Sequence, residues 1–571
     1  MAKLRVALCQ INSVVGDISG NSQQVMKWLN AAEKAGCDAA LFPELALVGY
    51  PPEDLLLKRK FVEQSRSVME TVAAASGSCV AVVGFVDTDT AGKCWNSAGI
   101  AAQGQLHKVY HKRELPNYGV FDERRYFQAG DGQAGLYEVA GVQVGVVICE
   151  DAWVANGPMT QLAEAGAKVL FCLNASPYHA NKAAQRQTVV QQRAAETGCD
   201  IVYVNLVGGQ DELVFDGSSL VMSAQGEVVA QALSFREQML IAEINVCCDS
   251  KIPASPKLAT QPAPPQRLRL APHSAVDTQV NSVAPRLSRL DEQYEALVLA
   301  TADYVHKNGF SEVGIGLSGG IDSSLVAVIA MDALSANHVH GVLMPSRYSS
   351  DHSLNDARTL CDNLGIEHRI IPLELGHQAF LDMLAPSFEG LEPDLTEENM
   401  QARIRGTLLM ALSNKFGWLI LTTGNKSENA VGYSTLYGDT AGAYAVIKDL
   451  WKTQVYEFAR HRNQRAKQSL IPQNVLTKPP SAELRPNQRD DQCLPPYEVL
   501  DPLLEAYVED DLTPADLCQQ GFDKELVHQI TTLVDRAEFK RRQNPPGVRI
   551  TAKAFGRDRR LPITNRYRGA N

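Results

Sequence analysis

The chain has 571 residues, too many for one hydrophobic core, so we expect two or more domains. Its 45% hydrophobic and 21% charged residues are typical of a soluble globular protein, and no apolar run approaches the length of a membrane span. The net charge of −11 argues against nucleic acid as the main partner. The twelve cysteines are scattered, without a Cys-x-x-Cys or a Cys/His cluster, which predicts a reducing cytoplasm and no structural zinc.

Short apolar strands alternate with helical stretches along most of the chain, which predicts an α/β fold. We expect the N-terminus to begin as a strand and not as a signal peptide. In the first half, strands are expected at 5–11, 39–43, 80–86, 142–149, 169–174 and 201–207, with helices at 22–35 and 182–197. In the second half, strands are expected near 313 and at 339–344, 368–371 and 418–422, with helices at 325–334, 351–364 and 397–416.

A change of composition separates the two halves. Residues 249–286 are rich in proline, alanine and serine and show no apolar periodicity, so this segment contributes little core and is interpreted as a linker. The sequence therefore predicts a first domain at residues 1–248 and a second domain at residues 287–571.

Three expected strand ends of the first domain carry reactive side chains: Glu44, Lys112 and Cys149. A cysteine becomes a nucleophile when a carboxylate can take its proton and a cation lowers its pKa. Taken singly, each has a plainer explanation, as a satisfied acid, a solvated amine or a small buried hydrophobic residue. In this order they resemble the nitrilase superfamily, whose Glu-Lys-Cys triad hydrolyses amides and nitriles. The resemblance covers residues 3–245 and implies an αββα sandwich.

Two longer segments sharpen this resemblance. Residues 48–54, after Glu44, and residues 115–123, after Lys112, resemble the glutaminase domain of glutamine-dependent NAD synthetases. The resemblance implies that Glu44 is the general base and that Lys112 stabilises the tetrahedral oxyanion. It implies that Cys149 is the nucleophile and forms a γ-glutamyl thioester.

The same resemblance implies three residues that hold glutamine. Tyr118 would close over its side chain, while Ser176 and Lys182 would hold its amino-acid end. A free α-carboxylate needs a cation and N–H donors, which suits Lys182. A cation at the start of a helix can also be merely solvated, and this alternative stays open for Lys182.

The second domain opens with a Ser/Gly turn between an apolar strand and a helix. The turn comprises Gly316, Leu317, Ser318, Gly319, Gly320, Ile321, Asp322 and Ser323. In such a turn, backbone N–H groups and the helix N-terminus point at a phosphate. The absence of a lysine beside the last serine rules out a Walker loop. The turn resembles the pyrophosphate loop of ATP pyrophosphatases, which implies a doubly wound parallel sheet; a plain glycine-rich turn is the alternative.

Two further segments are polar where a parallel sheet would bind a ligand. Asn399, Arg403 and Gly406 share one face of the expected helix 397–416, although a solvated amphipathic helix gives the same spacing. Residues 421–428 end a strand with polar groups, at the edge where open parallel sheets bind ligands.

From residue 293 to 553 the chain resembles the synthetase part of the same family, which implies a role for each of several residues. ATP contacts are implied for Thr423, Lys452 and Ser481; deamido-NAD contacts for Asn399, Arg403, Glu428, Asp439 and Lys540; and Mg²⁺ ligands for Asp322 and Glu428. Carboxylate oxygens beside phosphates suit Mg²⁺. A plain proline-rich turn is the alternative for Ser481, and a solvated end or subunit contact is the alternative for the basic tail that holds Lys540.

Together these features predict an enzyme that amidates deamido-NAD with ammonia from glutamine, through an adenylylated nicotinic-acid carboxylate. Glutamine, ATP, deamido-NAD and Mg²⁺ are the expected ligands, and the resemblance implies a homo-oligomer formed through the synthetase domain. One alternative is another ATP pyrophosphatase, such as a different carboxylate-amidating or tRNA-modifying enzyme, with a nitrilase module as its ammonia source. A second alternative is a non-catalytic scaffold that keeps only the fold.

Overall fold

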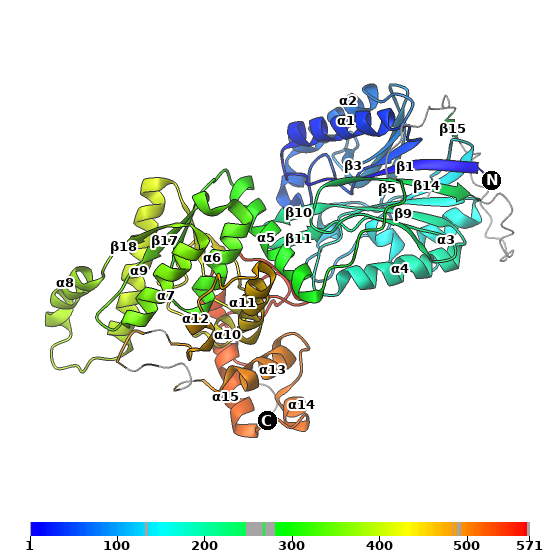
Figure 1. The fold of residues 1–571 in the computed structure, drawn as a ribbon. Helices are drawn as coiled ribbons and strands as arrows, with labels where there is room; N and C mark the ends of the chain where they lie inside the picture. The colour runs from blue at the N-terminus through cyan, green and yellow to red at the C-terminus, as the bar shows by residue number, and fades with distance from the viewer. Residues whose placement is uncertain are drawn as a thin grey trace. The chain divides into compact units, whose positions relative to one another are not determined.

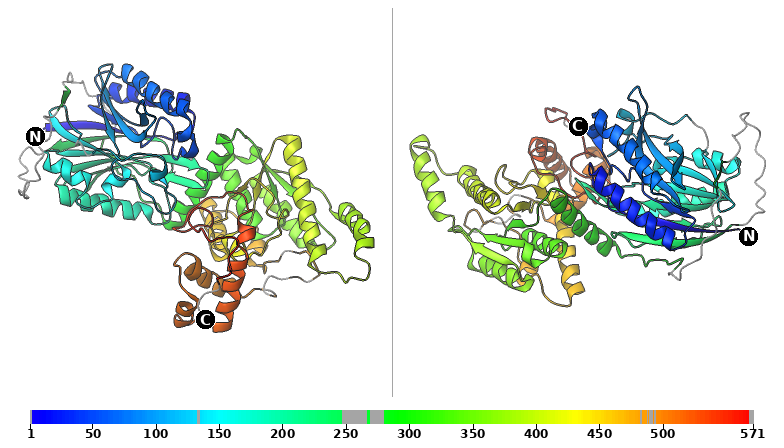
Figure 2. Two further views of the ribbon diagram at one scale, coloured as in Figure 1. Left: turned by 180° about the vertical axis from the view of Figure 1, so that it is seen from behind. Right: turned by 90° about the horizontal axis from the view of Figure 1, so that it is seen from above.

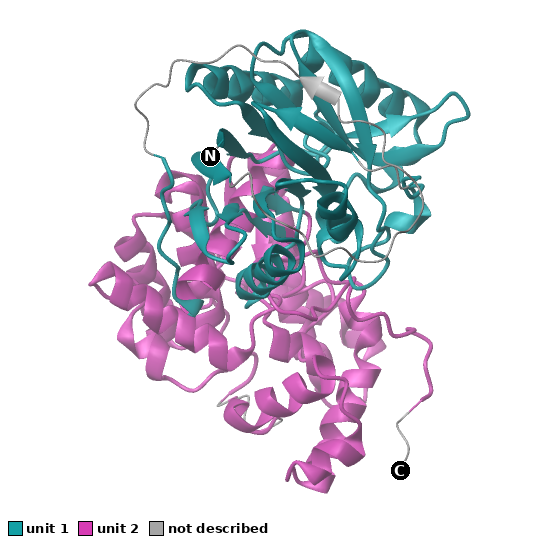
Figure 3. Ribbon diagram, turned by 90° about the vertical axis from the view of Figure 1, so that its right-hand side faces the viewer, with its two compact units in different colours: residues 1–210, 214–289 teal, residues 211–213, 290–571 magenta. Residues whose placement is uncertain are grey.

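The computed structural model describes residues 2–131, 135–246, 266–268, 280–481, 483–486, 488, 492 and 494–567. The chain divides into two compact units, Met1–Gln210 with Val214–Arg289, and Asp211–Leu213 with Leu290–Asn571 (Figure 3). Most of the expected linker at 249–286 lies outside the described residues. Among the described residues, no helix is both long and apolar enough to cross a membrane.

The first unit contains two large sheets. The first sheet has the order β14-β1-β2-β3-β4-β5, formed by β1 (Ala2–Gln10), β2 (Ala39–Leu41), β3 (Val80–Thr88), β4 (Cys94–Ala102), β5 (Gln105–His111) and β14 (Gln238–Val246). The second has the order β13-β12-β9-β8-β7-β6-β15, formed by β6 (Leu136–Val139), β7 (Val142–Ile148), β8 (Val169–Asn174), β9 (Asp200–Asn205), β12 (Leu220–Met222), β13 (Val228–Gln231) and β15 (Gln266–Leu268). A separate pair joins β10 (Val207–Gln210) and β11 (Leu213–Asp216).

Helices cover the outer faces of both sheets (Figures 1 and 2). The helices are α1 (Ile18–Lys34) and α2 (Arg59–Ala74) on the first sheet, and α3 (Pro158–Glu164) and α4 (Lys182–Thr197) on the second. The inner faces share one core, in which Leu8 and Val82 of the first sheet join Val146 and Phe171 of the second. Strands covered on both faces must be apolar throughout, which explains the continuous valine-rich runs. This arrangement confirms the expected αββα sandwich.

The second unit is built on one parallel sheet with the order β18-β17-β16-β19-β20. Its strands are β16 (Val313–Gly316), β17 (Val339–Leu343), β18 (Glu367–Ile370), β19 (Leu419–Thr422) and β20 (Tyr444–Ala445). The strand order reverses at β16, which pairs with β17 on one side and β19 on the other. Because ligands of open parallel sheets bind at the carboxyl ends of such strands, the polar ends of β16 and β19 mark the site. The doubly wound sheet is confirmed.

The remaining helices of this unit flank the sheet or form a small helical group near the C-terminus (Figure 1). They are α5 (Arg289–Lys307), α6 (Ile321–Leu334), α7 (Asp351–Leu364), α8 (Glu374–Leu384), α9 (Leu395–Phe416), α10 (Lys426–Val431), α11 (Lys452–Ala466), α12 (Gln473–Thr477), α13 (Tyr497–Val508), α14 (Pro514–Gln519), α15 (Lys524–Arg536) and α16 (Glu538–Arg541). Short 3-10 helices are η1 (Glu53–Leu57), η2 (Glu123–Arg125) and η3 (Cys149–Ala152) in the first unit, and η4 (Ala336–His338) and η5 (Ala385–Ser387) in the second.

Two expected boundaries differ from the structure in ways that bear on function. The strand expected at 142–149 ends at Ile148, because Cys149 has a φ of 44° and opens the 3-10 turn η3. The helix expected at 325–334 begins at Ile321, so Asp322 lies in its first turn. Local capping fixes other ends, such as the capping box of Asp394 and Glu397 at the start of α9.

Candidate active sites

The thiol of Cys149 lies at a strained turn between β7 and η3. A non-glycine residue with positive φ is uncommon, and such backbone strain is concentrated at functional sites. Burial raises the pKa of the Cys149 thiol well above its ordinary value, and the charge of Glu44 raises it further, while Lys112 opposes both. The resting thiol is therefore neutral and needs a base before it can attack.

Glu44 and Lys112 form a buried ion pair beside this thiol. Lys112 Nζ lies 2.7 Å from Glu44 Oε1, and neither side chain is exposed. The same oxygen accepts a hydrogen bond from Asn96 Nδ2 at 2.7 Å, and Glu44 Oε2 accepts one from the backbone N–H of Ala175 at 2.9 Å. These contacts fix the carboxylate, and the sequence-predicted triad of Glu44, Lys112 and Cys149 is brought together in one buried cluster.

A second carboxylate, that of Glu123, completes this cluster. Lys112 Nζ donates to both oxygens of Glu123 at 2.9 Å, and Tyr50 OH donates to Oε1 at 2.9 Å. Burial raises the pKa of Glu123 to about 7; Lys112 opposes this rise and Glu44 adds to it. Burial by itself would lower the pKa of Lys112, but Glu123 and Glu44 raise it well above its ordinary value. Lys112 therefore stays an ammonium.

Sequence reasoning assigned no role to Glu123 or Asn96. Glu123 ends the segment 115–123 that carried the resemblance, and this position was its only signal. Asn96 lies in β4, and its contact with Glu44 joins residues 52 positions apart, which no local pattern indicates.

The residues expected to hold glutamine adjoin the triad. Tyr118 is exposed, and its hydroxyl donates to both carboxylate oxygens of Glu150 at 3.1 Å. Ser176 is buried and follows Ala175, whose N–H binds Glu44. The Lys182 ammonium lies 3.9 Å from the ring centroid of Trp153, so Lys182 is not merely a solvated cation.

The Ser/Gly turn of the second unit has the geometry of a tight loop before a helix. Gly319 has a φ of 75°, and a Cβ there would lie 2.1 Å from the carbonyl oxygen of Ser353, so only glycine fits. Ser318 Oγ accepts a hydrogen bond from the N–H of Gly320 at 3.2 Å, and Ser323 Oγ donates to the carbonyl of Gly320 at 3.2 Å. The turn leads directly into α6 and leaves the N-terminus of that helix beside it.

Three predicted residues of the second unit converge on one point. The Lys452 ammonium lies 2.5 Å from Asp322 Oδ2 and 3.2 Å from Glu428 Oε1. Asn425 Nδ2 donates to Asp322 Oδ1 at 2.9 Å, and the N–H of Glu428 donates to Asn425 Oδ1 at 3.0 Å. Burial would lower the pKa of Lys452, but Asp322 and Glu428 raise it well above its ordinary value. The two carboxylates thus face one cation.

The other residues expected to contact ATP lie on neighbouring loops. Thr423 follows the last residue of β19. Ser481 is exposed; its hydroxyl donates to the carbonyl of Gln488 at 2.5 Å and accepts from the N–H of Glu483. Glu483 in turn accepts from the hydroxyl of Ser353 at 2.8 Å. Because the carbonyl of Ser353 packs against Gly319, the loop that holds Ser481 is tied to the Ser/Gly turn.

The predicted face of α9 packs against residues 435–441. Thr435 Oγ1 donates to Asn399 Oδ1 at 2.7 Å, and Arg403 Nε donates to the carbonyl of Leu436 at 3.3 Å. Gly406 continues this face, since a Cβ there would lie 2.8 Å from the carbonyl of Tyr437. This part of α9 is therefore not simply a solvated amphipathic helix.

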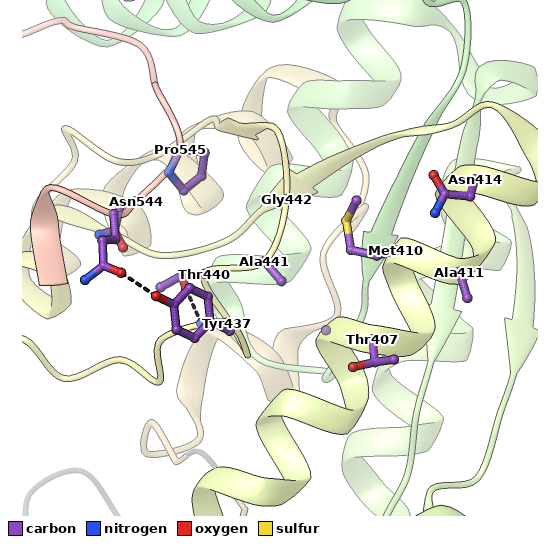
Figure 4. A pocket seen from close by; sticks show the side chains of 12 residues that line it. Thr407, Met410, Ala411, Asn414, Tyr437, Thr440, Ala441, Gly442, Asn544 and Pro545 are labelled. Carbon is purple, nitrogen blue, oxygen red and sulfur yellow. Dashed lines mark hydrogen bonds between the residues drawn. The ribbon is translucent and has the colours of Figure 1, made fainter.

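The same segment borders a cavity of about 650 Å³ (Figure 4). Figure 4 shows Thr407, Met410 and Asn414 along α9, with Tyr437 and Pro545 on other segments of its wall. The cavity is lined by Gly406, Thr407, Met410, Ala411, Asn414, Tyr437, Thr440, Ala441, Gly442, Gln543, Asn544 and Pro545. None of these residues is charged, so the cavity suits an uncharged part of a ligand.

Asp439 and Lys540 lie beside this segment, and both already have protein partners. Asp439 Oδ1 accepts a hydrogen bond from the N–H of Thr435 at 2.6 Å. Lys540 Nζ donates to the carbonyls of Gly432 and Ser434 at 2.8 and 2.9 Å. Elsewhere in the basic tail, Arg541 is buried against Glu538 and donates to the carbonyl of Ala430 at 2.6 Å. Much of the tail's positive charge is thus used within the fold.

Family models match both units. Residues 5–247 match the carbon-nitrogen hydrolase family, and residues 293–544 match the NAD synthase family. Together with the two sites, these matches define a carbon-nitrogen hydrolase joined to an NAD synthase of the ATP pyrophosphatase fold.

Relatives that match over the whole length settle the family. The glutamine-dependent NAD(+) synthetase of Thermotoga maritima is 45% identical over 100% of both chains, and that of Acinetobacter baylyi is 42% identical over 100% of this chain and 99% of its own. A solved glutamine-dependent NAD+ synthetase from Acinetobacter baumannii, in complex with ADP, is 42% identical, with a TM-score of 0.75 over 99% of both chains. The chain belongs to the glutamine-dependent NAD(+) synthetases, so the alternatives of a different ATP pyrophosphatase and of a non-catalytic scaffold were wrong.

Proposed function

We propose that two separate sites carry the reaction of this family, one around Cys149 and one around Asp322. The enzyme amidates deamido-NAD to NAD with ammonia released from glutamine. ATP adenylylates the nicotinic-acid carboxylate, ammonia displaces AMP, and the other products are pyrophosphate and glutamate. The observation that carries the assignment is that each site brings its predicted charged residues together in one cluster, which is buried in the first unit and partly buried in the second.

In the glutaminase reaction, Glu44 takes the proton of the Cys149 thiol, and the thiolate attacks the amide carbon of glutamine. Lys112 donates to the oxyanion that forms. Glu44 then gives its proton to the leaving nitrogen, so that ammonia departs and a γ-glutamyl thioester remains. Glu44 next takes a proton from water, which attacks the thioester; glutamate leaves, and the thiolate of Cys149 recovers a proton. The short contacts of Lys112 with Glu44 and Glu123 support these roles.

Glutamine is held by Tyr118, Ser176 and Lys182 in this proposal. The exposed phenol of Tyr118 can cover the side chain of glutamine, while Ser176 and Lys182 hold its amino-acid end. Glu150 interacts electrostatically with both Cys149 and Lys182. This supports a site that binds zwitterionic glutamine with its amide end at the thiol.

In the synthetase reaction, the phosphates of ATP bind the Ser/Gly turn from Gly316 to Ser323, with Thr423, Lys452 and Ser481 as further contacts. The carboxylate of nicotinic acid attacks the α-phosphorus and pyrophosphate leaves. Asp322 and Glu428 would hold a Mg²⁺ ion, since their two hard oxygen donors converge on one cation, Lys452, and phosphates and water would supply the remaining ligands. When bound, the metal neutralises charge on the phosphate oxygens.

Deamido-NAD is assigned to Asn399, Arg403, Glu428, Asp439 and Lys540. Their support is that α9 and residues 435–441 form one packed surface beside the uncharged cavity. A neutral cavity beside cations and amides suits a dinucleotide, which has both uncharged rings and phosphates.

The domain limits stay as the sequence predicts them, with a glutaminase domain at 1–248, a linker at 249–286 and a synthetase domain at 287–571. We further propose a homo-oligomer formed through the synthetase domain, a cytoplasmic location, and no nucleic-acid partner. The nine cysteines that the structure describes are all free thiols, which supports a reducing compartment.

The test is turnover of deamido-NAD with glutamine, ATP and Mg²⁺, with all products measured in one sample. NAD, AMP and pyrophosphate are expected in equal amounts, together with at least as much glutamate. AMP that forms without NAD would contradict the synthetase assignment. Glutamate release that persists in Cys149→Ala would contradict the glutaminase assignment.

A further inference from the structure

The triad is divided between the two sheets of the first unit. Glu44 follows β2 and Lys112 follows β5, both in the first sheet, whereas Cys149 follows β7 in the second. The separation between the nucleophile and the ammonium therefore depends on contacts that join the two sheets.

Asp151 supplies such contacts with both oxygens of one carboxylate. Its Oδ2 accepts hydrogen bonds from the backbone N–H of Ile148 at 3.0 Å and from Tyr110 OH at 2.8 Å. Its Oδ1 accepts from the backbone N–H groups of Arg113 at 3.1 Å and Glu114 at 2.9 Å. Asp151 is fully buried, so no solvent molecule takes the place of these donors.

The four donors flank the two reactive residues. Tyr110 and Arg113 lie on either side of Lys112 in the sequence, and Ile148 directly precedes Cys149. One carboxylate thus holds the backbone beside the ammonium and the backbone beside the thiol, and it also closes the turn that gives Cys149 its positive φ.

We propose that Asp151 is a positioning residue for glutamine hydrolysis, which fixes the Cys149 turn of one sheet against the Lys112 strand end of the other. The proposal rests on the proposed triad. In this proposal Asp151 touches neither the substrate nor the reacting atoms, and it sets the geometry of attack through the backbone that it holds. Displacements of about 1 Å in such a site can lower the rate about a hundredfold.

An amide cannot replace this carboxylate. Asparagine has one oxygen and one NH₂ group. Whichever way the amide is turned, its NH₂ group faces at least one of the backbone N–H donors, and two donors then oppose each other. Asp151→Asn has nearly the same size and should keep the sandwich packed. It should change the placement of Cys149 relative to Lys112 more than the binding of glutamine, whose proposed contacts are Tyr118, Ser176 and Lys182.

The experiment measures glutaminase kcat and KM and ammonia-dependent NAD synthesis in the full-length Asp151→Asn enzyme. We expect kcat for glutamine hydrolysis to fall at least about tenfold, with KM and the ammonia-dependent rate each within about twofold of the unmodified enzyme. The matched control is Asp200→Asn. Asp200 is a partly buried acid of the same unit that accepts a hydrogen bond from the N–H of Ala224 and lies outside the triad, so its change should leave kcat within about twofold.

If Asp151→Asn fails to fold, Tyr110→Phe removes a single donor and gives the second measurement. We then expect a loss of about two- to fivefold in kcat with KM unchanged, and faster hydrogen exchange in peptides that contain residues 111–115 and 147–152. Unchanged kcat and unchanged exchange in a folded variant would overturn the proposal. A parallel fall of kcat in Asp200→Asn would also overturn it, because the effect would then be general stability. Glutaminase activity that survives in Cys149→Ala would instead show that the triad assignment had failed.

Discussion

The ammonium of Lys452 lies 2.5 Å from Asp322 Oδ2 and so links the start of α11 to the first turn of α6. It also reaches Glu428 at 3.2 Å, so one positive charge holds two carboxylates together. A divalent cation placed between the same oxygens and the phosphates of ATP would find both carboxylates already oriented.

The first prediction concerns these carboxylates. Asp322→Asn or Glu428→Gln should lower AMP formation about a hundredfold or more, because each change removes a hard oxygen ligand beside the phosphates. AMP is measured across a magnesium titration, and hydrogen exchange in peptides from α6 and β19 is the control for folding of the second unit. The assignment fails if the magnesium dependence of AMP formation is the same in both variants and in the unmodified enzyme.

The second prediction concerns the separation of the two activities. Cys149→Ala should abolish glutamine-dependent NAD synthesis and leave ammonia-dependent synthesis within about twofold, because the nucleophile and the Ser/Gly turn belong to different units. Both rates are measured on one preparation. A folded variant that also loses the ammonia-dependent rate would show that the two sites are not separate.

The third prediction separates the two effects of Glu44 on Cys149. The negative charge of Glu44 raises the pKa of the thiol, so Glu44→Gln should lower that pKa. The same change removes the general base and should lower glutaminase kcat about a hundredfold or more. Thiolate absorbance in the ultraviolet, followed against pH and corrected with Cys149→Ala, gives the pKa. A thiol pKa that rises in Glu44→Gln would contradict the electrostatic account.

The fourth prediction is a pH dependence of stability caused by Glu123. Its pKa is about 7 in the folded protein against an ordinary value of 4.5, so between these values the folded state holds a proton that the unfolded state releases. The free energy of unfolding should therefore fall as pH rises through this window, by up to about 3 kcal/mol in total. Glu123→Gln should remove this part of the pH dependence. The prediction concerns the slope of the unfolding free energy against pH and not its value at a single pH.

The measurement for Glu123 is urea unfolding at several pH values. Unfolding is monitored by hydrogen exchange in peptides from β4 and β5, so that only the first unit is observed. Glu63→Gln, a change on the exposed side of α2, is the control. A slope that is equal in Glu123→Gln and the unmodified enzyme would show that Glu123 does not hold the extra proton.

The sequence predicted those parts of the sites that follow from strand ends and turns. Glu44, Cys149 and the Ser/Gly turn each lie at or within a few residues of the end of an apolar strand, so local pattern and family resemblance indicated the same residues. The parallel sheet likewise placed Thr423 and Glu428 near the turn, because β16 and β19 are neighbours.

What the sequence could not predict depends on contacts between distant residues. Glu123 binds Lys112 from the short 3-10 helix η2, Asn96 binds Glu44 from β4, and Asp151 joins two sheets. None of these pairings leaves a periodic signal, because each is set by how the sheets pack. The tail shows the same limit: its basic composition did not indicate that Arg541 would be buried beside Glu538.

The last prediction concerns the transfer of ammonia between the two reactions. Ammonia in water is mostly protonated at neutral pH, and ammonium is a poor nucleophile, so release into bulk solvent would waste glutamine. A covalent tether raises the effective concentration of one unit near the other but cannot retain a small neutral molecule. We therefore expect protected transfer, measured by NAD synthesis with ¹⁵N-amide glutamine in excess unlabelled ammonium. The label in NAD should come mainly from glutamine; label diluted to the bulk ratio would show that the ammonia first mixes with solvent.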